Sequence, residues 1–167
     1  TIDYQLQRAA ASGRTALTAP VALRDVVERL VGTLGKVYQE KQIRFSISVD
    51  PSHQLHCDES DLIEILGNLL DNACKWCGGE VTVRSNVAGD TGGGVLTIEI
   101  VDDGPGIPAE QKSRVLDRGV RADPETEGQG IGLAVVRELV EEVYGGSLAL
   151  LDNAPRGTCV RVQVPWG

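Results

Sequence analysis

One segment of the chain, from about Ser60 to Trp76, has the residue spacing of a strongly amphipathic helix. When successive residues are placed about 100° apart, the apolar side chains gather on one side: Leu62, Ile65, Leu66, Leu69, Ala73 and Trp76. The polar side chains gather on the other side: Glu64, Asn68, Asp71, Asn72 and Lys75. Because the apolar side belongs in a core, the chain must supply a second layer of structure to cover it.

The polar stripe contains two asparagines one turn apart, Asn68 and Asn72, followed by Lys75. Asparagine is a mediocre helix former because its amide competes for backbone hydrogen bonds, so its presence twice in a Leu-rich helix needs another reason. An amide oxygen is a hard ligand that suits Mg²⁺, and a lysine ammonium suits a phosphate. The stripe is therefore either a metal and phosphate site or simply the solvated face of a helix.

The rest of the chain alternates between helical and strand-like spacing. Helical spacing also runs from Leu23 to about Lys41 and from about Ile131 to Val143. Alternating apolar residues predict strands in five segments: residues 43–49, 81–87, 96–101, 147–151 and 158–164. We expect an α+β fold, a two-layer α/β sandwich with a mixed, mostly antiparallel sheet and helices on one face.

Length and composition limit the possible functions. A chain of 167 residues fits one domain, and its net charge of -8 argues against a general nucleic-acid or anionic-membrane surface. Any phosphate site must therefore be local. No apolar run approaches the roughly 20 residues that cross a bilayer. Cys74 and Cys77 fall within the predicted helix, so we interpret this pair as small apolar residues, with reduced thiols in a cytosolic compartment.

A first glycine-rich run, Asp102 to Pro108, follows directly on a predicted strand. A carboxylate at a strand end can accept a hydrogen bond from an exocyclic amine, and glycines without Cβ atoms let a flat ring approach the backbone. Adenine offers both features. Asp-Gly-Pro-Gly is also ordinary turn chemistry, so the run alone leaves both interpretations open.

A second glycine run, Gly128 to Leu133, lies just before a predicted helix, where backbone amides attract phosphate. An acidic loop precedes it instead of a strand, which argues against a Rossmann dinucleotide site. Between the two runs the sequence is basic: Lys112, Arg114, Arg118 and Arg121. This interval either forms a lid that places guanidinium groups over a triphosphate or is a solvated charged helix.

Taken in order, four segments resemble the asparagine, first-glycine, phenylalanine and second-glycine boxes of sensor histidine kinases: residues 68–76, 102–107, 116–119 and 128–133. The closing run Gly157-Thr158-Cys159-Val160 resembles the terminal Gly-Thr element of that family. The resemblance covers residues 20 to 165. It implies the Bergerat ATP-binding fold shared with gyrase, Hsp90 and MutL, with ATP and Mg²⁺ as cofactors.

The resemblance also implies a metal site and a phosphate site. Asn72 is implied to ligate Mg²⁺, with Asn68 and Gln129 as helpers. Three basic residues are implied to act on the phosphates during transfer: Lys75, Arg118 and Arg121.

The base and ribose contacts are implied in the same way. Asp102 corresponds to the residue that reads the adenine amine, with Thr158 supporting it through water, and Trp76 to one that packs by the ribose or base, where relatives usually have Tyr. The two glycine runs are implied to supply the remaining nucleotide contacts: Gly104, Gly106, Ile107, Gly130, Ile131, Gly132 and Leu133.

Two features depart from the family pattern. Leu116 stands where the family usually has Phe, although it keeps the apolar character. No phosphoacceptor is recognisable, because His53 and His56 lie in a predicted loop without the family's acidic neighbour, and we interpret both as surface histidines. Residues 1–19 resemble the end of a dimerisation helix and a linker, and residues 20–167 the catalytic and ATP-binding domain.

We therefore expect the catalytic domain of a bacterial inner-membrane sensor, on its cytoplasmic side. Its expected partners are a dimerisation and phosphoacceptor domain and a response regulator, without nucleic acid and without direct membrane contact, and the chain itself is expected to be monomeric. Two alternatives stay open: an ATP-hydrolysing clamp of the gyrase or Hsp90 kind, and a nucleotide-binding regulator of the anti-sigma kind. Position 68 argues against the clamp, because those hydrolases usually have Glu where this chain has Asn68, which cannot act as a base.

Overall fold

The computed structural model describes residues 20–89, 93–106, 129–152 and 156–166, and the side chains of residues 129–132 and 166 lie outside this description. The helices are α2 (Leu23–Val37), the 3₁₀ turn η1 (Gln39–Lys41), α3 (Glu59–Trp76), α5 (Gln129–Glu138) and the π-helical turn η2 (Leu139–Val143). The strands are β1 (Pro20–Ala22), β2 (Arg44–Ser48), β3 (Gln54–His56), β4 (Glu80–Ala88), β5 (Gly94–Asp102), β6 (Ser147–Asp152) and β7 (Thr158–Trp166).

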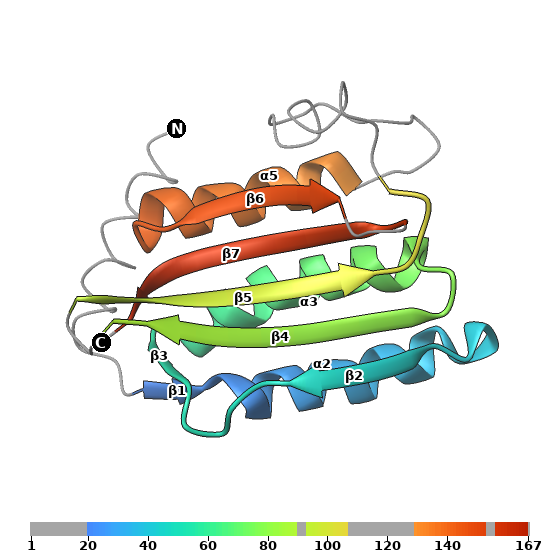
Figure 1. The fold of residues 1–167 in the computed structure, drawn as a ribbon, viewed down its shortest axis with the longest axis horizontal. Coiled ribbons are helices and arrows are strands. Elements are labelled where there is room, and N and C mark those ends of the chain that lie inside the picture. The colour runs from blue at the N-terminus through green and yellow to red at the C-terminus, as the bar shows by residue number, and fades with distance from the viewer. Residues whose placement is uncertain (1–19, 90–92, 107–128, 153–155, 167) are drawn as a thin grey trace.

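Five of these strands form one sheet in the order β2-β4-β5-β7-β6. The β2–β4 pair is parallel, and the other three pairs are antiparallel. Helices α2, α3 and α5 all lie on one side of this sheet (Figure 1). The predicted α+β two-layer sandwich with a mixed, mostly antiparallel sheet is therefore confirmed.

Helix α3 is the central element of the helical layer and packs against α2, α5 and β5. The N-cap residue of α3 is Asp58, whose side chain accepts a hydrogen bond from the backbone N–H of Ser60. This cap begins the helix where the sequence predicts it. Five of its six predicted apolar side chains are buried, and the sixth, Trp76, is half-buried. The amphipathic pattern thus correctly identified the face that meets the sheet.

A second, two-stranded sheet was not predicted. Strand β1 pairs antiparallel with β3, and Pro20 lies opposite His56. The prediction of a loop through residues 51–56 was therefore wrong for Gln54–His56, which is too short to show an alternating pattern.

The two histidines differ in exposure. His56 is exposed, as predicted, whereas His53 is half-buried. The Nδ1 atom of His53 lies 2.7 Å from the Ser85 hydroxyl, and its carbonyl accepts the N–H of Leu23. His53 therefore ties the small sheet to the large one and is not a simple surface residue.

All four cysteines are free and buried: Cys57, Cys74, Cys77 and Cys159. Cys77 is the C-cap of α3, one residue beyond the helix in which it was predicted. Burial raises the pKa of Cys57 and of Cys74 to about 12. Their thiols are therefore neutral at physiological pH, which agrees with their interpretation as small apolar residues.

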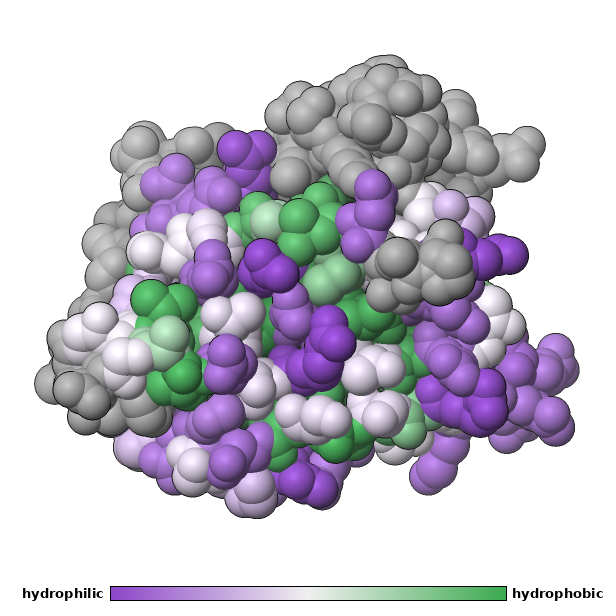
Figure 2. Space-filling view, viewed as in Figure 1, coloured by the Kyte–Doolittle hydropathy of each residue, from purple (hydrophilic) through white to green (hydrophobic). Residues whose placement is uncertain are grey.

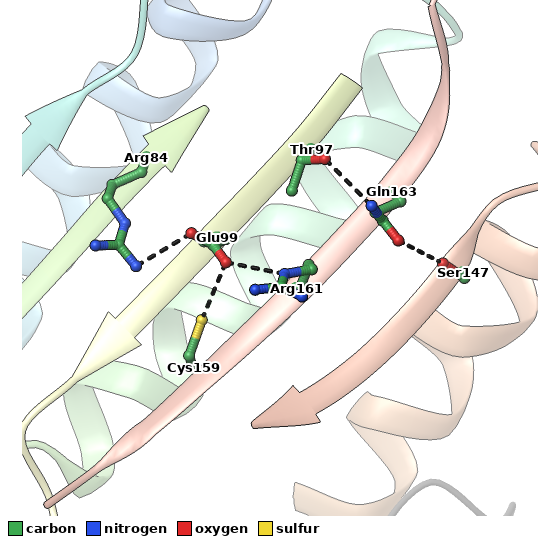
Figure 3. A network of polar contacts seen from close by, with 7 residues as sticks. All are labelled: Arg84, Thr97, Glu99, Ser147, Cys159, Arg161 and Gln163. Carbon is green, nitrogen blue, oxygen red and sulfur yellow. Dashed lines mark hydrogen bonds and ion pairs between the residues drawn. The ribbon is translucent and has the colours of Figure 1, made fainter. Parts of the chain in front are cut away.

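The sheet face opposite the helices is largely polar (Figure 2). At its centre Glu99 lies between Arg84 and Arg161, at N–O distances of 3.1 and 2.9 Å (Figure 3). Burial opposes ionisation of Glu99, but the two guanidinium groups hold its pKa below the ordinary value. The polarity of this outer face explains why the fold stops at two layers.

Candidate functional site

Three elements that carry predicted site residues meet at one end of the molecule. The carboxyl ends of α3 and β5 lie there, together with the first residues of α5 (Figure 1). The structure therefore brings together segments that are 26 or more residues apart in the chain, because Trp76, Asp102 and Gln129 are their respective terminal residues.

Asp102 is the last residue of β5, and only 8% of its surface is exposed. It lies opposite Thr158 in the β5–β7 pair, and both belong to the alternation that faces the helices, together with Ile100 and Val160. Its Oδ1 atom accepts the N–H of Gly104 at 2.9 Å. Burial raises the pKa of Asp102, although backbone hydrogen bonds from Gly104 and Thr158 oppose the rise.

Gly104 brings the first glycine run against the end of α3. A Cβ atom added to Gly104 would lie 2.1 Å from the carbonyl oxygen of Trp76, so only glycine fits between the two segments. Gly106 has a φ of +83° and lies close to the carbonyl of Gly157. Both glycines are thus required by the packing of the protein itself, in addition to any access that they give to a ligand.

The polar stripe of α3 divides into two parts. Asp71 accepts a hydrogen bond from the Tyr38 hydroxyl at 2.7 Å, which joins α3 to the end of α2. Asn68 donates from Nδ2 to the carbonyl of Glu64 at 2.7 Å, Asn72 is half-buried, and Lys75 is exposed. Asp71 therefore serves packing, and the two asparagines and the lysine retain the side-chain groups predicted for a ligand.

The described residues fit a magnesium ion that arrives with a nucleotide better than one held by protein alone. No group of three or more His, Cys, Asp or Glu side chains that could hold a metal occurs in the described ranges. Mg²⁺ is commonly bound by one or two protein oxygens together with substrate phosphates, a role that amide oxygens of Asn68 and Asn72 suit. The buried Nε1 atom of Trp76 also has no hydrogen-bond partner among the residues that the structure describes, so a polar ligand at the end of α3 would satisfy it.

Three charged residues at this end of the fold were missed from the sequence. Lys41 donates to carbonyl oxygens of the last turn and C-cap of α3, and Asp103 accepts from the backbone of the turn that follows this helix. The Arg156 Nε atom donates to the Gly104 carbonyl at 3.2 Å. Each one binds a distant backbone group, for which the sequence carries no signal. Arg156 could only have been suspected from its place beside the Gly157-Thr158 element.

The remaining predicted site residues are only partly described. Ile107, Arg118 and Arg121 lie outside the described residues, as do the side chains of Gln129, Gly130, Ile131 and Gly132, whose backbone forms the start of α5. Leu133 is buried in the hydrophobic core. Its predicted contact with phosphate therefore stays a prediction, while its packing role is established.

Comparison with known proteins gives the same class of fold. Residues 57–167 match the family described as "Histidine kinase-, DNA gyrase B-, and HSP90-like ATPase". The mycobacterial sensor histidine kinase MprB superposes with a TM-score of 0.75 at 34% identity, covering 89% of this chain and 97% of that one. ShkA, solved in complex with AMPPNP, superposes with a TM-score of 0.74 at 26% identity over 89% of this chain and 31% of its own.

The chain therefore belongs to the family of histidine kinase-, DNA gyrase B- and HSP90-like ATPases. Within it, the chain is the catalytic, ATP-binding domain of a sensor histidine kinase. It is 40% identical over 162 residues to the two-component sensor PhoQ of Pseudomonas aeruginosa, an alignment that covers 97% of this chain and 35% of that protein. The chain thus spans about a third of the length of the curated relatives that it matches. Among the described residues, no helix is long and apolar enough to cross a membrane.

Proposed function

We propose that this domain binds Mg-ATP at the shared end of α3 and β5 and transfers the γ-phosphate to a histidine of a dimerisation domain. One observation supports the proposal most strongly. Asp102 is a buried carboxylate on the inner face of the sheet, and burial raises its pKa. Its charged form therefore lowers the stability of the fold, and a carboxylate kept at such a position is typical of a functional site. An adenine amine that donates to this carboxylate would offset the cost.

The proposal assigns a role to each site residue. Asp102 reads the adenine, and Thr158, its neighbour on β7, supports it. Asn72 and Asn68 offer oxygens to Mg²⁺, and Lys75 at the end of α3 contacts phosphate. Trp76 packs by the ribose or base. The predicted contributions of other residues belong to the same proposal: Gly104, Gly106, Ile107, Arg118, Arg121, Gln129, Gly130, Ile131, Gly132 and Leu133.

The transfer is an in-line displacement. The bond from the γ-phosphorus to its bridging oxygen breaks while a phosphorus–nitrogen bond to the acceptor imidazole forms, and ADP leaves. Bound Mg²⁺ supplies neutralisation of the phosphate charge. Lys75, with Arg118 and Arg121, offsets the negative charge on the phosphate oxygens in the transition state.

Asn68 favours phosphotransfer over hydrolysis. Its amide cannot accept a proton from water at neutral pH, so no base stands at this position to activate a water molecule. His53 is half-buried against Ser85 and His56 is on the small sheet. We therefore expect no acid-labile phosphate on either histidine when the domain is incubated alone with ATP.

The first experiment tests the adenine role of Asp102. Asp102→Asn is expected to weaken ATP and ADP far more than GTP, because the amide presents a donor where the exocyclic amine of adenine needs an acceptor. Affinities are measured by isothermal titration with and without Mg²⁺. An equal loss of affinity for ATP and GTP would contradict the assigned role.

The second experiment tests phosphotransfer. The domain is mixed with a separately purified dimerisation hairpin of its own parent kinase and γ-labelled ATP. Label on the hairpin is expected. Release of labelled inorganic phosphate with no label on the hairpin would favour the ATP-hydrolysing clamp.

We further propose that the domain lies on the cytoplasmic side of an inner-membrane sensor and that a response regulator receives the phosphate.

A further inference from the structure

The turn that follows α3 is held by a cation on one side of its backbone. The Lys41 ammonium donates to the carbonyl oxygens of Cys74, Lys75 and Cys77 at 2.7, 3.0 and 3.1 Å. An ammonium has three donors, so all of them are used. The last carbonyls of a helix have no partner within the helix and carry partial negative charge, so Lys41 satisfies them and stabilises this end.

An anion holds the other side of the same turn. The Oδ1 atom of Asp103 accepts the N–H groups of Gly78, Gly79 and Glu80 at 2.8, 3.0 and 3.0 Å. Burial works against ionisation of Asp103, yet these hydrogen bonds hold its pKa below the ordinary value. Asp103 is therefore an anion at physiological pH. Because it directly follows Asp102, it connects the end of β5 to the turn after α3.

We propose that Lys41 and Asp103 are positioning residues, which fix the last turn of α3 against the end of β5 and so set the distance between the phosphate and adenine parts of the site. The last turn carries Lys75 and Trp76, and the end of β5 carries Asp102. This inference rests on the proposed function, since it concerns the same site. Neither residue is assigned any contact with the nucleotide.

The proposal predicts which part of α3 moves when Lys41 is lost. Asn68 and Asn72 are adjacent to Leu69 and Ala73, which are buried in the core, so they keep their positions. Lys75 and Trp76 are the first and second residues after Cys74, the last residue of α3 that is buried in the core, and the carbonyls around them are the ones that Lys41 holds. Loss of Lys41 should therefore loosen Trp76 even in the absence of nucleotide.

The experiment uses the fluorescence of Trp76. The chain has two tryptophans, so Trp166→Phe leaves Trp76 as the only tryptophan, which can be excited selectively over the three tyrosines. In this background Lys41→Met is compared with the conservative Lys41→Arg and with Lys36→Met, a matched control at an exposed lysine in the last turn of α2. Emission and acrylamide quenching are recorded without nucleotide, and AMPPNP affinity is measured with Mg²⁺, well below each melting temperature.

For Lys41→Met we expect red-shifted, more easily quenched emission and an AMPPNP Kd raised about tenfold, with smaller changes for Lys41→Arg and none for Lys36→Met. Asp103→Ala should behave as Lys41→Met does. A folded Lys41→Met protein with parental Trp76 emission, or with parental AMPPNP affinity, would overturn the proposal. Failure of the parent protein to bind AMPPNP would instead refute the proposed function. The emission comparison would still test whether Lys41 holds the last turn of α3 in place.

Discussion

The contact between Gly104 and the end of α3 makes a sharp prediction for Gly104→Ala. The new Cβ would lie 2.1 Å from the Trp76 carbonyl oxygen, 2.9 Å from its carbonyl carbon and 3.0 Å from Asp102 Oδ1. Real Cβ atoms are essentially never found within 3.0 Å of such atoms, so the two segments must separate by at least 0.9 Å, the difference between 2.1 and 3.0 Å. All three contacts are with backbone or with a buried side chain, which cannot simply rotate away.

The separation acts on stability and on binding together. Overpacking of this kind costs about 1–3 kcal/mol, which for a domain of this size lowers the melting temperature by roughly 2–12 °C. The same movement shifts Asp102 away from Trp76 and Lys75, so we expect the Kd for AMPPNP to rise by about tenfold or more.

The control variant is Gly79→Ala. A Cβ at Gly79 has nothing within 4 Å, and alanine keeps the N–H that bonds Asp103. Its melting temperature and its AMPPNP affinity should stay close to those of the wild type. Melting is followed by circular dichroism and affinity by isothermal titration. A Gly104→Ala protein with the stability and affinity of Gly79→Ala would refute the close approach described here, and a loss of stability without any loss of affinity would refute its link to the nucleotide site.

Three further predictions test other parts of the structure. Asp102→Asn should raise the melting temperature of the nucleotide-free domain at pH 7, because burial raises the pKa of Asp102 and its charged form therefore opposes folding; the gain should disappear as the pH falls through that raised pKa, where the wild-type carboxyl is neutral too, and no gain at pH 7 would contradict this. Tyr144→Phe should cost about 1–2 kcal/mol in denaturant unfolding, since it removes the hydrogen bond to Asp61 in the first turn of α3, and should leave AMPPNP affinity unchanged because that turn is at the far end of the helix. Leu66→Ala, at a fully buried position, should cost about 2–5 kcal/mol, whereas Ile63→Ala on the exposed side of α3 should cost less than about 1 kcal/mol; equal losses would contradict the assigned core face.

The long elements could be predicted because burial of one face imposes a period on the sequence. Helix α3 was expected from about Ser60 to Trp76 and extends over Glu59–Trp76. The five strands of the main sheet were found in the same way. Strand β1 and strand β3 could not be found, since three residues hold less than two repeats of an alternating pattern and their pairing depends on the path of the whole chain.

The candidate site also contains residues that could be predicted from the sequence and residues that could not. Asp102 could be predicted as a site residue because it stands where a strand pattern changes into glycine-rich sequence. Lys41 and Asp103 could not, because each binds backbone groups that are between 23 and 36 residues away, and a backbone group leaves no trace in the sequence. Residues that position a site by holding the backbone are therefore visible only once the fold is known.

The side chain of Asn68 both hydrogen-bonds within its helix and suits the proposed chemistry. Asparagine costs stability within a helix because its amide seeks backbone partners, and here the cost is offset since Nδ2 donates to the Glu64 carbonyl one turn back. This bond uses one of the two N–H donors of Nδ2 and leaves the amide oxygen as the atom available to a cation. A glutamate at position 68 could not donate to that carbonyl and would add a group able to deprotonate water. The same local interaction that makes Asn68 tolerable in α3 therefore supports a site that binds a metal ion without activating water, as a kinase requires and a hydrolase does not.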